Sequence, residues 1–384
     1  MKIALTFGAF LPVPPALGGA TEKIWTALAE RLAARGHHIT AYSRLWPHWP
    51  ARETLRGVNH HRLPGHDHYP RLWQNLLLDL RWSLRLRKLI EPDALVITHN
   101  LTLPLLLRLP ALRHPAPVAI VLGRMPKGRL RLYPRLDRIY ATSQAVASRA
   151  ASESPRHQDS LRLLSNGIDW PLFQSSIPRP ASPVIHLGFA GRIHPEKGLH
   201  LLIAALVQLH RSSSPLPPWK LTLLGPATTA EGGGGDAYLH DLKISVQSAG
   251  LQDRITFLPP LWNPAELAAF YQSLDLFLYP SLAEQGETFG VSVAEAMAAG
   301  AVPLVSRLDC FRDLLGHDYD TLNFDHRSPD PACALAARLR DLLTARPLLE
   351  VLSSRLRFAA RRFDYAPVAA SLEADLETLK SVAG

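Results

Sequence analysis

Residues 274–305 constrain the fold more than any other stretch, because they combine two apolar strands, a polar loop and a short helix. The run 274–279 is hydrophobic and rich in aromatic residues, and the proline that follows halts it, which predicts a buried strand. Residues 290–299 are small and helix-forming and are followed by a glycine, which predicts a helix and its end. The apolar run 301–305 predicts a second strand. Such a unit is typical of an open α/β sheet, in which ligands bind at the carboxyl ends of the strands.

Two carboxylates stand on this unit, Glu287 in the loop and Glu295 in the helix. Glu295 is the only charged residue between 291 and 299, and a carboxylate on a buried helix needs a partner. Between the two glutamates, backbone N–H groups around Gly290 would favour a phosphate at the helix N-terminus. We therefore expect a phosphate-bearing ligand here, with ribose or sugar hydroxyls on Glu295. The alternative is an ordinary loop glutamate and a solvent-facing helix glutamate.

The spelling E-T-F-G-V-S-V-A-E from Glu287 to Glu295, followed by A-M-A-A-G-A-V-P-L-V-S, resembles the signature of retaining glycosyltransferase family 4. The resemblance, to enzymes of the glycogen synthase and spore-coat type, implies an α/β chain of the GT-B fold, with two Rossmann-like domains facing across a cleft. It also implies transfer of a sugar from a nucleotide diphosphate sugar to an acceptor. By the same resemblance Glu287 orients the donor sugar and Glu295 binds ribose. The residues between them that are expected to contact the donor are Thr288, Phe289, Gly290 and Val291.

The composition is that of an ordinary globular protein. Of the 384 residues 47% are hydrophobic and 20% are charged, which disfavours disorder and suits two domains. No run of eighteen apolar residues predicts a membrane span, and residues 2–7 predict a strand rather than a signal peptide. Two cysteines, Cys310 and Cys333, indicate a reduced cytoplasmic protein. The net charge of +9 favours anionic partners, which could be nucleotides, nucleic acid or an acidic membrane surface.

The amino-terminal residues predict a doubly wound domain that starts with a strand, a glycine-containing loop, a helix at 21–34 and a strand at 39–42. Gly18 and Gly19, at the start of this helix, would let the backbone approach a ligand phosphate or the acceptor closely, and we expect both at the nucleotide sugar, although a glycine pair is more often a simple turn. The loop is not the G-x-G-x-x-G fingerprint of nicotinamide enzymes. A strand at 94–97 leads to His99, which the family resemblance places near the donor sugar.

Residues 71–90 predict an amphipathic helix with a stripe of leucines, two tryptophans and a basic face. Such a helix can lie on anionic lipid, or it can pack its leucines on the sheet and expose the basic face to solvent. Residues 46–69 are rich in His, Arg and Pro, and we expect a loop there. The histidines between 60 and 68 could bind a metal, but an ordinary loop is the simpler interpretation.

In the carboxyl-terminal half, a strand at 185–190 precedes G-R-I-H-P-E-K-G, which resembles the second diphosphate element of the family. Arg192 and Lys197 would neutralise the two phosphates and stabilise the leaving group, although exposed basic loops are common. Gly225 and Leu261 follow two further predicted strands, where the family holds the nucleotide. Residues 231–235 predict a flexible loop, either a lid or an insert. Residues 307–313 depart from the glycine-rich turn usual at that place in the family.

The expected domains are 1–175 for the acceptor, 176–362 for the nucleotide sugar and a helix at 363–384 that crosses back to the first domain. The expected activity is retaining glycosyl transfer in polysaccharide, lipopolysaccharide or glycolipid synthesis, with Glu287, His99, Arg192 and Lys197 at the reaction centre. No metal and no cofactor beyond the nucleotide sugar is expected, and Asp318 and Asp320 are interpreted as loop residues. The expected location is the cytoplasm, with peripheral contact to the inner membrane face through 71–90.

Two alternatives remain open. One is a GT-B sugar epimerase or phosphorylase, which would need an acid and base pair or a cofactor lysine. The other is a basic membrane-surface or nucleic-acid binding protein without catalysis, and we expect no nucleic-acid partner because basic residues with interleaved aromatics cluster only at 71–90.

Overall fold

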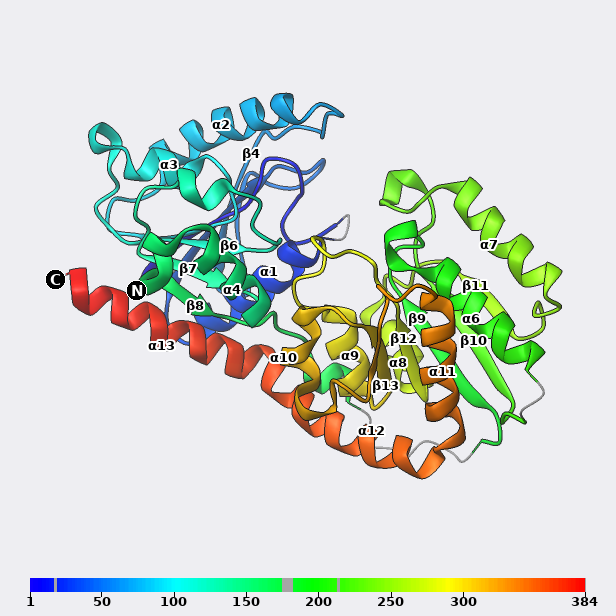
Figure 1. Cartoon of the computed structure of the whole chain (residues 1–384). Coiled ribbons are helices and arrows are strands. Elements are labelled where there is room, and N and C mark those ends of the chain that lie inside the picture. Colours follow the sequence, from blue (N-terminus) through cyan, green and yellow to red (C-terminus); the bar gives the residue numbers. More distant parts are fainter. Residues whose placement is uncertain (17–18, 175–181, 213–214, 384) are drawn as a thin grey trace. The chain divides into compact units, whose positions relative to one another are not determined.

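The computed structural model describes residues 1–16, 19–174, 182–212 and 215–383. The chain divides into two compact units, the first made of Met1–Gly167 with Tyr365–Gly384 and the second of Ile168–Asp364. Each unit is built on its own sheet with helices packed around it (Figure 1). The boundary expected between residues 175 and 176 falls outside the described residues.

The first unit contains an eight-stranded sheet that is parallel except at one edge, where β3 runs antiparallel to β4. In spatial order its strands are β3 (Arg52–Leu55), β4 (Val58–Leu63), β2 (His38–Arg44), β1 (Lys2–Thr6), β5 (Leu95–Thr98), β6 (Val118–Leu122), β7 (Arg138–Ala141) and β8 (Leu161–Leu163). Its helices are α1 (Ala20–Ala34), α2 (Leu72–Leu89), α3 (Leu103–Arg108), α4 (Gln144–Glu153) and α13 (Tyr365–Ala383).

The strand order of the first sheet reverses between β1 and β5. From β1 the chain proceeds to β2 and β4 on one side, and it then returns to β5 on the other side. In an open α/β sheet this reversal opens a crevice beyond the carboxyl ends of the two strands. The loop after β1 reaches Gly19 and the residue after β5 is His99, so the two predicted residues of this unit leave from neighbouring strands.

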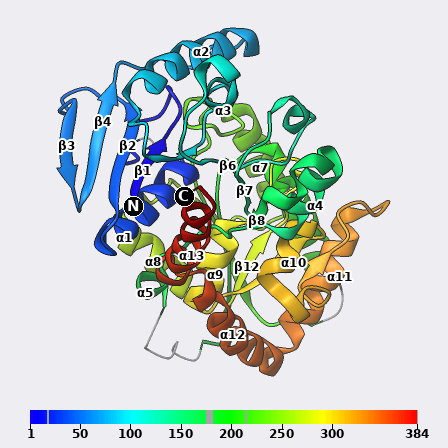
Figure 2. The same cartoon turned by 90° about the vertical axis from the view of Figure 1, so that its left-hand side faces the viewer.

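The expectation of a loop at 46–69 is wrong for its central part. Residues 58–63 form β4, which pairs in parallel with β2 from Val58 to Leu63, and Figure 2 shows β3 beside it at the edge of the sheet. His60 points into the protein and is buried, whereas its neighbour His61 is half-buried. Polar residues within the segment hid this alternation in the sequence. A strand near the edge of a sheet buries only every second side chain, so the others can be polar.

Helix α2 forms where it was predicted, but only part of the leucine stripe is buried. The fully buried side chains are Asp79, Trp82, Ser83 and Leu86, while Leu72 and Leu84 are exposed. Trp82 explains the rotation, because its indole Nε1 donates to the carbonyl of Phe7 at 2.9 Å beneath the first loop. The large ring and its hydrogen bond therefore determine which face packs on the sheet, and several leucines are left outside.

The last helix, α13, belongs to the first unit and packs beside α1 (Figure 1). Glu373 accepts from His37 at 2.7 Å, and Asp375 accepts from the hydroxyl of Tyr140 at 2.8 Å and from Arg138 at 3.0 Å. Because these partners lie after α1 and on β7, the helix is built into this unit by polar contacts as well as by its apolar side.

The second unit has a six-stranded sheet in which every neighbouring pair is parallel. In spatial order its strands are β11 (Ile255–Leu258), β10 (Trp219–Leu224), β9 (Ile185–Ala190), β12 (Leu276–Tyr279), β13 (Val302–Ser306) and β14 (Asn323–Phe324). Its helices are α5 (Trp170–Phe173), α6 (Leu199–Arg211), α7 (Asp236–Ser248), α8 (Pro264–Gln272), α9 (Val291–Ala299), α10 (Arg312–Leu315), α11 (Pro331–Thr344) and α12 (Arg346–Ala360).

This sheet reverses its order between β9 and β12, which pair directly. The loop 191–198 leaves β9 and the loop 280–290 leaves β12, so the chain segments that contain Lys197 and Glu287 start side by side. The two ends of the unit also meet, because the N–H of Ile168 donates to the carbonyl of Phe363 at 2.8 Å. Among the described residues, no helix is long and apolar enough to cross a membrane.

Candidate functional site

Lys197 and Glu287 form an enclosed ion pair at the carboxyl end of the second sheet. The Lys197 ammonium donates to Oε1 of Glu287, and their side chains are only 11% and 9% exposed. The ammonium also donates to the hydroxyl of Tyr279 at 2.9 Å. A charged pair taken out of water in this way needs such additional hydrogen bonds to be tolerated. The structure thus joins two of the residues that the sequence analysis proposed independently.

The pair keeps its lysine charged. Burial by itself lowers the pKa of the Lys197 ammonium, but the Tyr279 hydroxyl and the Glu287 carboxylate outweigh it, and the pKa is raised above its usual value. Burial also raises the pKa of the Tyr279 hydroxyl, and the nearby Glu287 carboxylate raises it further. At neutral pH the cluster therefore contains an ammonium and a neutral phenol.

Gly198 allows the two loops to approach each other. It has φ 68°, and a Cβ on it would lie 2.1 Å from the carbonyl oxygen of Pro280. The backbone of the two loops is also joined directly, since the N–H of Leu282 donates to the carbonyl of Glu196 at 2.7 Å. Any larger residue at 198 would push the Lys197 loop away from the Glu287 loop.

Helix α9 begins beside this pair. Its N-cap, Gly290, has φ 93°. The backbone hydrogen bonds of the helix begin at Val293, whose N–H donates to the carbonyl of Gly290 at 3.0 Å, so the N–H groups of Val291 and Ser292 come before them. Thr288 and Phe289 are buried, and the Phe289 ring meets the edge of Phe363 at 5.2 Å between centroids. Thr288 and Phe289 therefore anchor the start of α9, while the amides from Gly290 and Val291 onward are the groups suited to an anion.

Glu295 is 5% exposed, so the solvent-facing alternative is wrong. Its Oε2 accepts a long hydrogen bond of 3.4 Å from the hydroxyl of Tyr271 on α8. Burial raises the pKa of Tyr271 well above its usual value, and the charge of Glu295 adds to the effect. Each glutamate of the motif is thus contacted by one buried tyrosine hydroxyl.

Arg192 lies at the edge of the same loop but is paired with protein groups. Its guanidinium donates to Glu196 and to the carbonyl of Gly232 at 2.8 Å. The loop expected at 231–235 lies against the Arg192 loop, since the N–H of Gly234 donates to the carbonyl of Ile193 at 2.8 Å. At Gly233 a Cβ would lie 2.2 Å from the carbonyl of Ala227, so the glycines allow this segment to pack under the Arg192 loop.

Gly225 and Leu261 lie at the ends of neighbouring strands, as predicted from their place in the sequence. Gly225 follows β10, and a Cβ there would meet the carbonyl oxygen of Gly191 at 1.8 Å. Leu261 is half-buried in the segment after β11, whereas the adjacent Trp262 is 65% exposed.

The proposed residues of the first unit are Gly18, Gly19 and His99, and Gly18 lies outside the described residues. Gly19 is the N-cap of α1 with φ 104°, and the carboxylate of Glu22 folds back toward it. Burial raises the pKa of Glu22. That carboxylate occupies the helix N-terminus where a phosphate was expected as one possibility.

His99 is enclosed by aromatic rings. It stacks on Phe7 at 5.5 Å and meets the edge of Trp25 at 5.0 Å. Burial lowers the pKa of His99 to about 3, so the imidazole is neutral at pH 7. Its Nε2 is buried and has no hydrogen-bond partner in the described structure. An unpaired buried nitrogen is costly, which makes His99 a candidate for a ligand contact.

Metal ligands do not gather in the described part of the chain, where no three His, Cys, Asp or Glu side chains are grouped suitably. The second-unit aspartates that were interpreted as loop residues include Asp318, which is buried and paired with Arg355. Asp320 is exposed.

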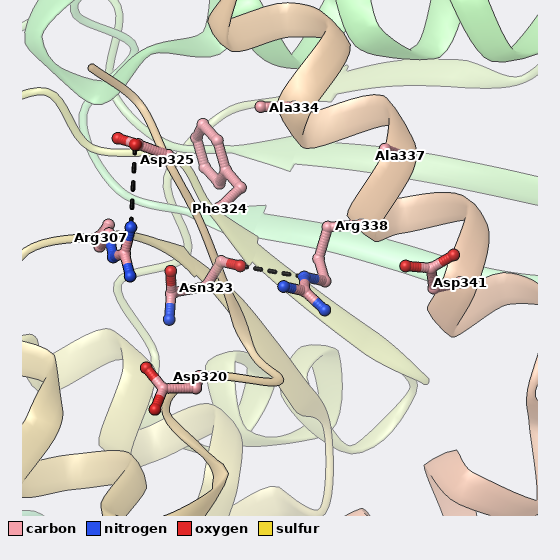
Figure 3. Close-up of a pocket in the computed structure, with 9 residues that line it drawn as sticks. All are labelled: Arg307, Asp320, Asn323, Phe324, Asp325, Ala334, Ala337, Arg338 and Asp341. Atoms are coloured by element: carbon pink, nitrogen blue, oxygen red, sulfur yellow. Dashed lines mark hydrogen bonds and ion pairs between the residues drawn. The ribbon is translucent and has the colours of Figure 1, made fainter. Parts of the chain in front are cut away.

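A separate pocket of about 540 Å³ lies along the edge strand β14 and helix α11 (Figure 3). Arg338 donates to the carbonyl of Asn323 at 3.1 Å, which satisfies the backbone at the open edge of the sheet. Arg307, from the stretch that departs from the family, faces Asp325 at 3.8 Å. None of the predicted site residues lines this pocket.

Sequence analysis missed Tyr279, Ser281 and Tyr271, which contact the two glutamates. Tyr279 and Ser281 stand on either side of the proline that ends β12, and Ser281 Oγ donates to Glu287 Oε1 at 3.0 Å. Their place at the carboxyl end of a buried strand, six and eight residues before Glu287, was the available signal. No periodicity in the sequence connects Tyr271 with Glu295.

Comparison with known families matches both halves of the chain. Residues 18–170 match the family described as Glycosyltransferase Family 4, and residues 177–358 match the family described as Glycosyl transferases group 1.

Two curated relatives match over part of their length. A D-inositol 3-phosphate glycosyltransferase of Arthrobacter sp. (strain FB24) is 31% identical over 48% of this chain and 43% of its own. The lipopolysaccharide core biosynthesis mannosyltransferase LpcC of Rhizobium leguminosarum bv. viciae is 28% identical over 48% of this chain and 49% of its own length. The chain thus spans about half the length of the curated relatives it matches.

A solved structure matches nearly the whole chain. Anabaena HepE in complex with UDP and glucose aligns over 98% of this chain and 100% of its own, with a TM-score of 0.71 and 19% identity. This likeness, together with the two mostly parallel sheets, shows an α/β fold of two Rossmann-like domains of the GT-B type.

Proposed function

Because the chain belongs to the family 4 glycosyltransferases, we propose that it transfers a sugar from a nucleoside diphosphate sugar to an acceptor with retention at the anomeric carbon. The observation that supports this most is the enclosed Lys197 and Glu287 pair beside the N-terminus of α9. It combines a cation for a diphosphate, a carboxylate for sugar hydroxyls and a helix end for an anion, all in one unit.

In this proposal the second unit binds the donor. The diphosphate contacts Lys197, Arg192 and the first amides of α9, which requires Arg192 to exchange its contact with Glu196 for the phosphate. Glu287 orients the donor sugar and Glu295 accepts from the ribose hydroxyls. The nucleotide also contacts the backbone near Gly225 and Leu261.

The proposed chemistry needs no protein nucleophile. The bond between the anomeric carbon and the phosphate oxygen breaks while the acceptor oxygen attacks the same face of the sugar. The acceptor proton passes to the departing phosphate oxygen, and the charge left on the diphosphate is stabilised by Lys197 and Arg192. Because these two cations supply that stabilisation, we propose that no metal is required, and activity should persist in EDTA.

The first unit contributes Gly19 and His99 in this proposal. A neutral imidazole with an unpaired, buried Nε2 suits a hydrogen bond to a sugar hydroxyl.

The acceptor is proposed to be a polysaccharide, lipopolysaccharide or glycolipid precursor, since one relative is named for lipopolysaccharide core synthesis. Membrane contact through 71–90 is part of this proposal. On α2 the outward side chains of Leu72, Trp73, Leu77 and Leu84 are 59%, 56%, 48% and 42% exposed, and Arg81 and Arg85 are exposed beside them. Apolar and basic side chains on one outer face suit the inner, anionic surface of a membrane. In this proposal the protein therefore acts at the cytoplasmic face of the membrane.

Thermal shift with UDP, GDP, ADP and their common sugars tests the donor proposal on the wild type and on Glu295→Ala. A ligand at about 100 times its Kd stabilises by roughly 2.7 kcal/mol, which is readily measured. A shift with one nucleotide that shrinks in Glu295→Ala supports the proposal and identifies the base, with UDP as the first choice because HepE was solved with it. No shift with any nucleotide would contradict donor binding and would favour a non-catalytic binding protein.

A further inference from the structure

The hydroxyl of Tyr279 lies at the centre of the buried cluster in the second unit. It is 2.9 Å from Nζ of Lys197 and 2.9 Å from Oε1 of Glu287. An ammonium can only donate, so the phenol oxygen accepts a hydrogen bond from Lys197 and its O–H donates a hydrogen bond to Glu287. The hydroxyl therefore connects the cation proposed for the diphosphate with the carboxylate proposed for the sugar.

Packing alone does not account for this hydroxyl. The Tyr279 ring stacks on Phe189 and on Phe277, with centroids 5.9 Å apart in both cases. Phe277 lies two residues earlier on β12 and fills the same aromatic layer without an oxygen. A phenylalanine at 279 would satisfy the layer equally well, so the oxygen serves the polar cluster.

Three donors converge on one oxygen of Glu287. Lys197, Tyr279 and Ser281 all donate to Oε1, the last at 3.0 Å. Within the described chain, every hydrogen bond to this carboxylate reaches Oε1, which leaves Oε2 to accept from a ligand hydroxyl. A carboxylate held by several donors at one oxygen cannot rotate freely, so its second oxygen has a defined direction.

We propose that Tyr279 is a positioning residue for glycosyl transfer, which orients Glu287 toward the donor sugar through Oε1 without touching the sugar itself. This inference rests on the proposed function. It assigns Tyr279 to the sugar-dependent part of binding and to turnover, and not to binding of the nucleoside diphosphate, whose proposed contacts are Lys197, Arg192 and the helix amides.

The test compares Tyr279→Phe with a matched control, Tyr319→Phe. Tyr319 is also a buried tyrosine of the second unit, and its hydroxyl donates to the carbonyl of Leu308 at 3.2 Å, outside the cluster. Calorimetry measures Kd for UDP, UDP-glucose, GDP and GDP-mannose on each protein. The rate at which the nucleoside diphosphate is released from the sugar nucleotide by water gives kcat and KM without a known acceptor.

For Tyr279→Phe we expect Kd of the nucleoside diphosphate to change by less than about threefold, while kcat for its release falls by roughly 10- to 100-fold. The affinity gained from the sugar moiety should also be lost. Tyr319→Phe should keep wild-type kcat and Kd, which excludes a general effect of losing one buried hydroxyl from this unit.

The outcomes separate this inference from the function on which it rests. If wild type binds none of the four probes, the proposed function fails and this inference with it. If wild type binds and Tyr279→Phe retains wild-type kcat, only the positioning role is overturned. Should Tyr279→Phe fail to fold, Ser281→Ala removes another donor to the same oxygen and must show the same loss of kcat at unchanged diphosphate affinity. An equal loss of both in Ser281→Ala would overturn the role.

Discussion

A Cβ on Gly225 would lie 1.8 Å from the carbonyl oxygen of Gly191, so the ends of strands β10 and β9 touch through bare backbone. The contact leaves room for no side chain at 225. It also lies next to the loop that begins with Arg192, which links the packing of the sheet to the proposed donor site.

Gly225→Ala should destabilise the second unit by about 3 kcal/mol, because backbone must shift to admit the methyl group. Gly250→Ala is the matched control: Gly250 also has positive φ, 70°, but nothing lies within 4 Å of its Cβ position. The control should cost only about 1 kcal/mol from the backbone conformation. Thermal unfolding of the two variants measures the difference, and equal costs would refute the close approach.

Lys197→Met should destabilise the protein by about 3–5 kcal/mol, since it leaves the Glu287 carboxylate buried without its cation. Adding Glu287→Gln removes that uncompensated charge. The double variant should therefore be more stable than the sum of the two single changes, by at least about 1.5 kcal/mol. Unfolding free energies of the four proteins give this coupling, and simple additivity would show that the pair is not coupled in solution.

Stability of the first unit should fall as the pH is lowered below about 6.5. Burial lowers the pKa of His60 to about 4, and the charge of Arg62 contributes in the same direction. The folded state therefore binds the proton less readily than the unfolded chain, so nothing is lost above pH 6.5 and stability declines between pH 6.5 and about 4. At about 1.4 kcal/mol per pKa unit, discounted for solvent screening, the loss is roughly 2 kcal/mol.

His60→Leu should make that pH dependence less steep, measured by urea unfolding at a series of pH values, while His99 of the same unit, whose pKa burial lowers to about 3, keeps its own contribution. Gly250→Ala in the second unit, which changes no titratable group, serves as the control and should leave the slope unchanged. A slope retained in His60→Leu would assign the acid sensitivity to another group.

Exchange of Trp73 and Leu77 for serine should weaken binding to anionic vesicles by about tenfold or more, because burial of these exposed side chains would supply much of the attraction. Charge reversal of Arg81 and Arg85 should instead weaken the dependence on salt concentration. Phe358→Ser is the control, since Phe358 is 77% exposed on α12 of the other unit. Sedimentation with vesicles measures each variant, and unchanged binding in the first would remove the membrane contact through α2.

The fold could be predicted well from the sequence where apolar runs are continuous. The strand that became β12 is an uninterrupted apolar segment, and β9 and β13 are mostly apolar, because both faces of a parallel sheet are covered. β4 was missed, since its alternation of His, Arg and Asn disguised a strand with one inner face. On α2 the leucine stripe predicted only part of the buried face, because a single tryptophan with a buried hydrogen bond outweighs several leucines.

The motif glutamates and Lys197 could be proposed from local spelling, yet their mutual pairing could not. Lys197 and Glu287 are brought together by the pairing of β9 with β12, which depends on the order of strands across the whole sheet. The contact of Tyr271 with Glu295 depends on the packing of α8 against α9, which no single stretch of sequence encodes.

The second unit is an insertion within the first. Its ends pair at Ile168 and Asp364, while Gly167 lies so close to Tyr365 that a Cβ would meet the tyrosine ring at 2.3 Å. During synthesis the ribosome therefore completes residues 168–364 before it makes α13. The first unit cannot complete its fold until that last helix has been synthesised. A short linker from residue 167 to residue 365 would let that unit be made alone, and the excised insert would have adjacent ends suited to cyclisation or to exchange between relatives.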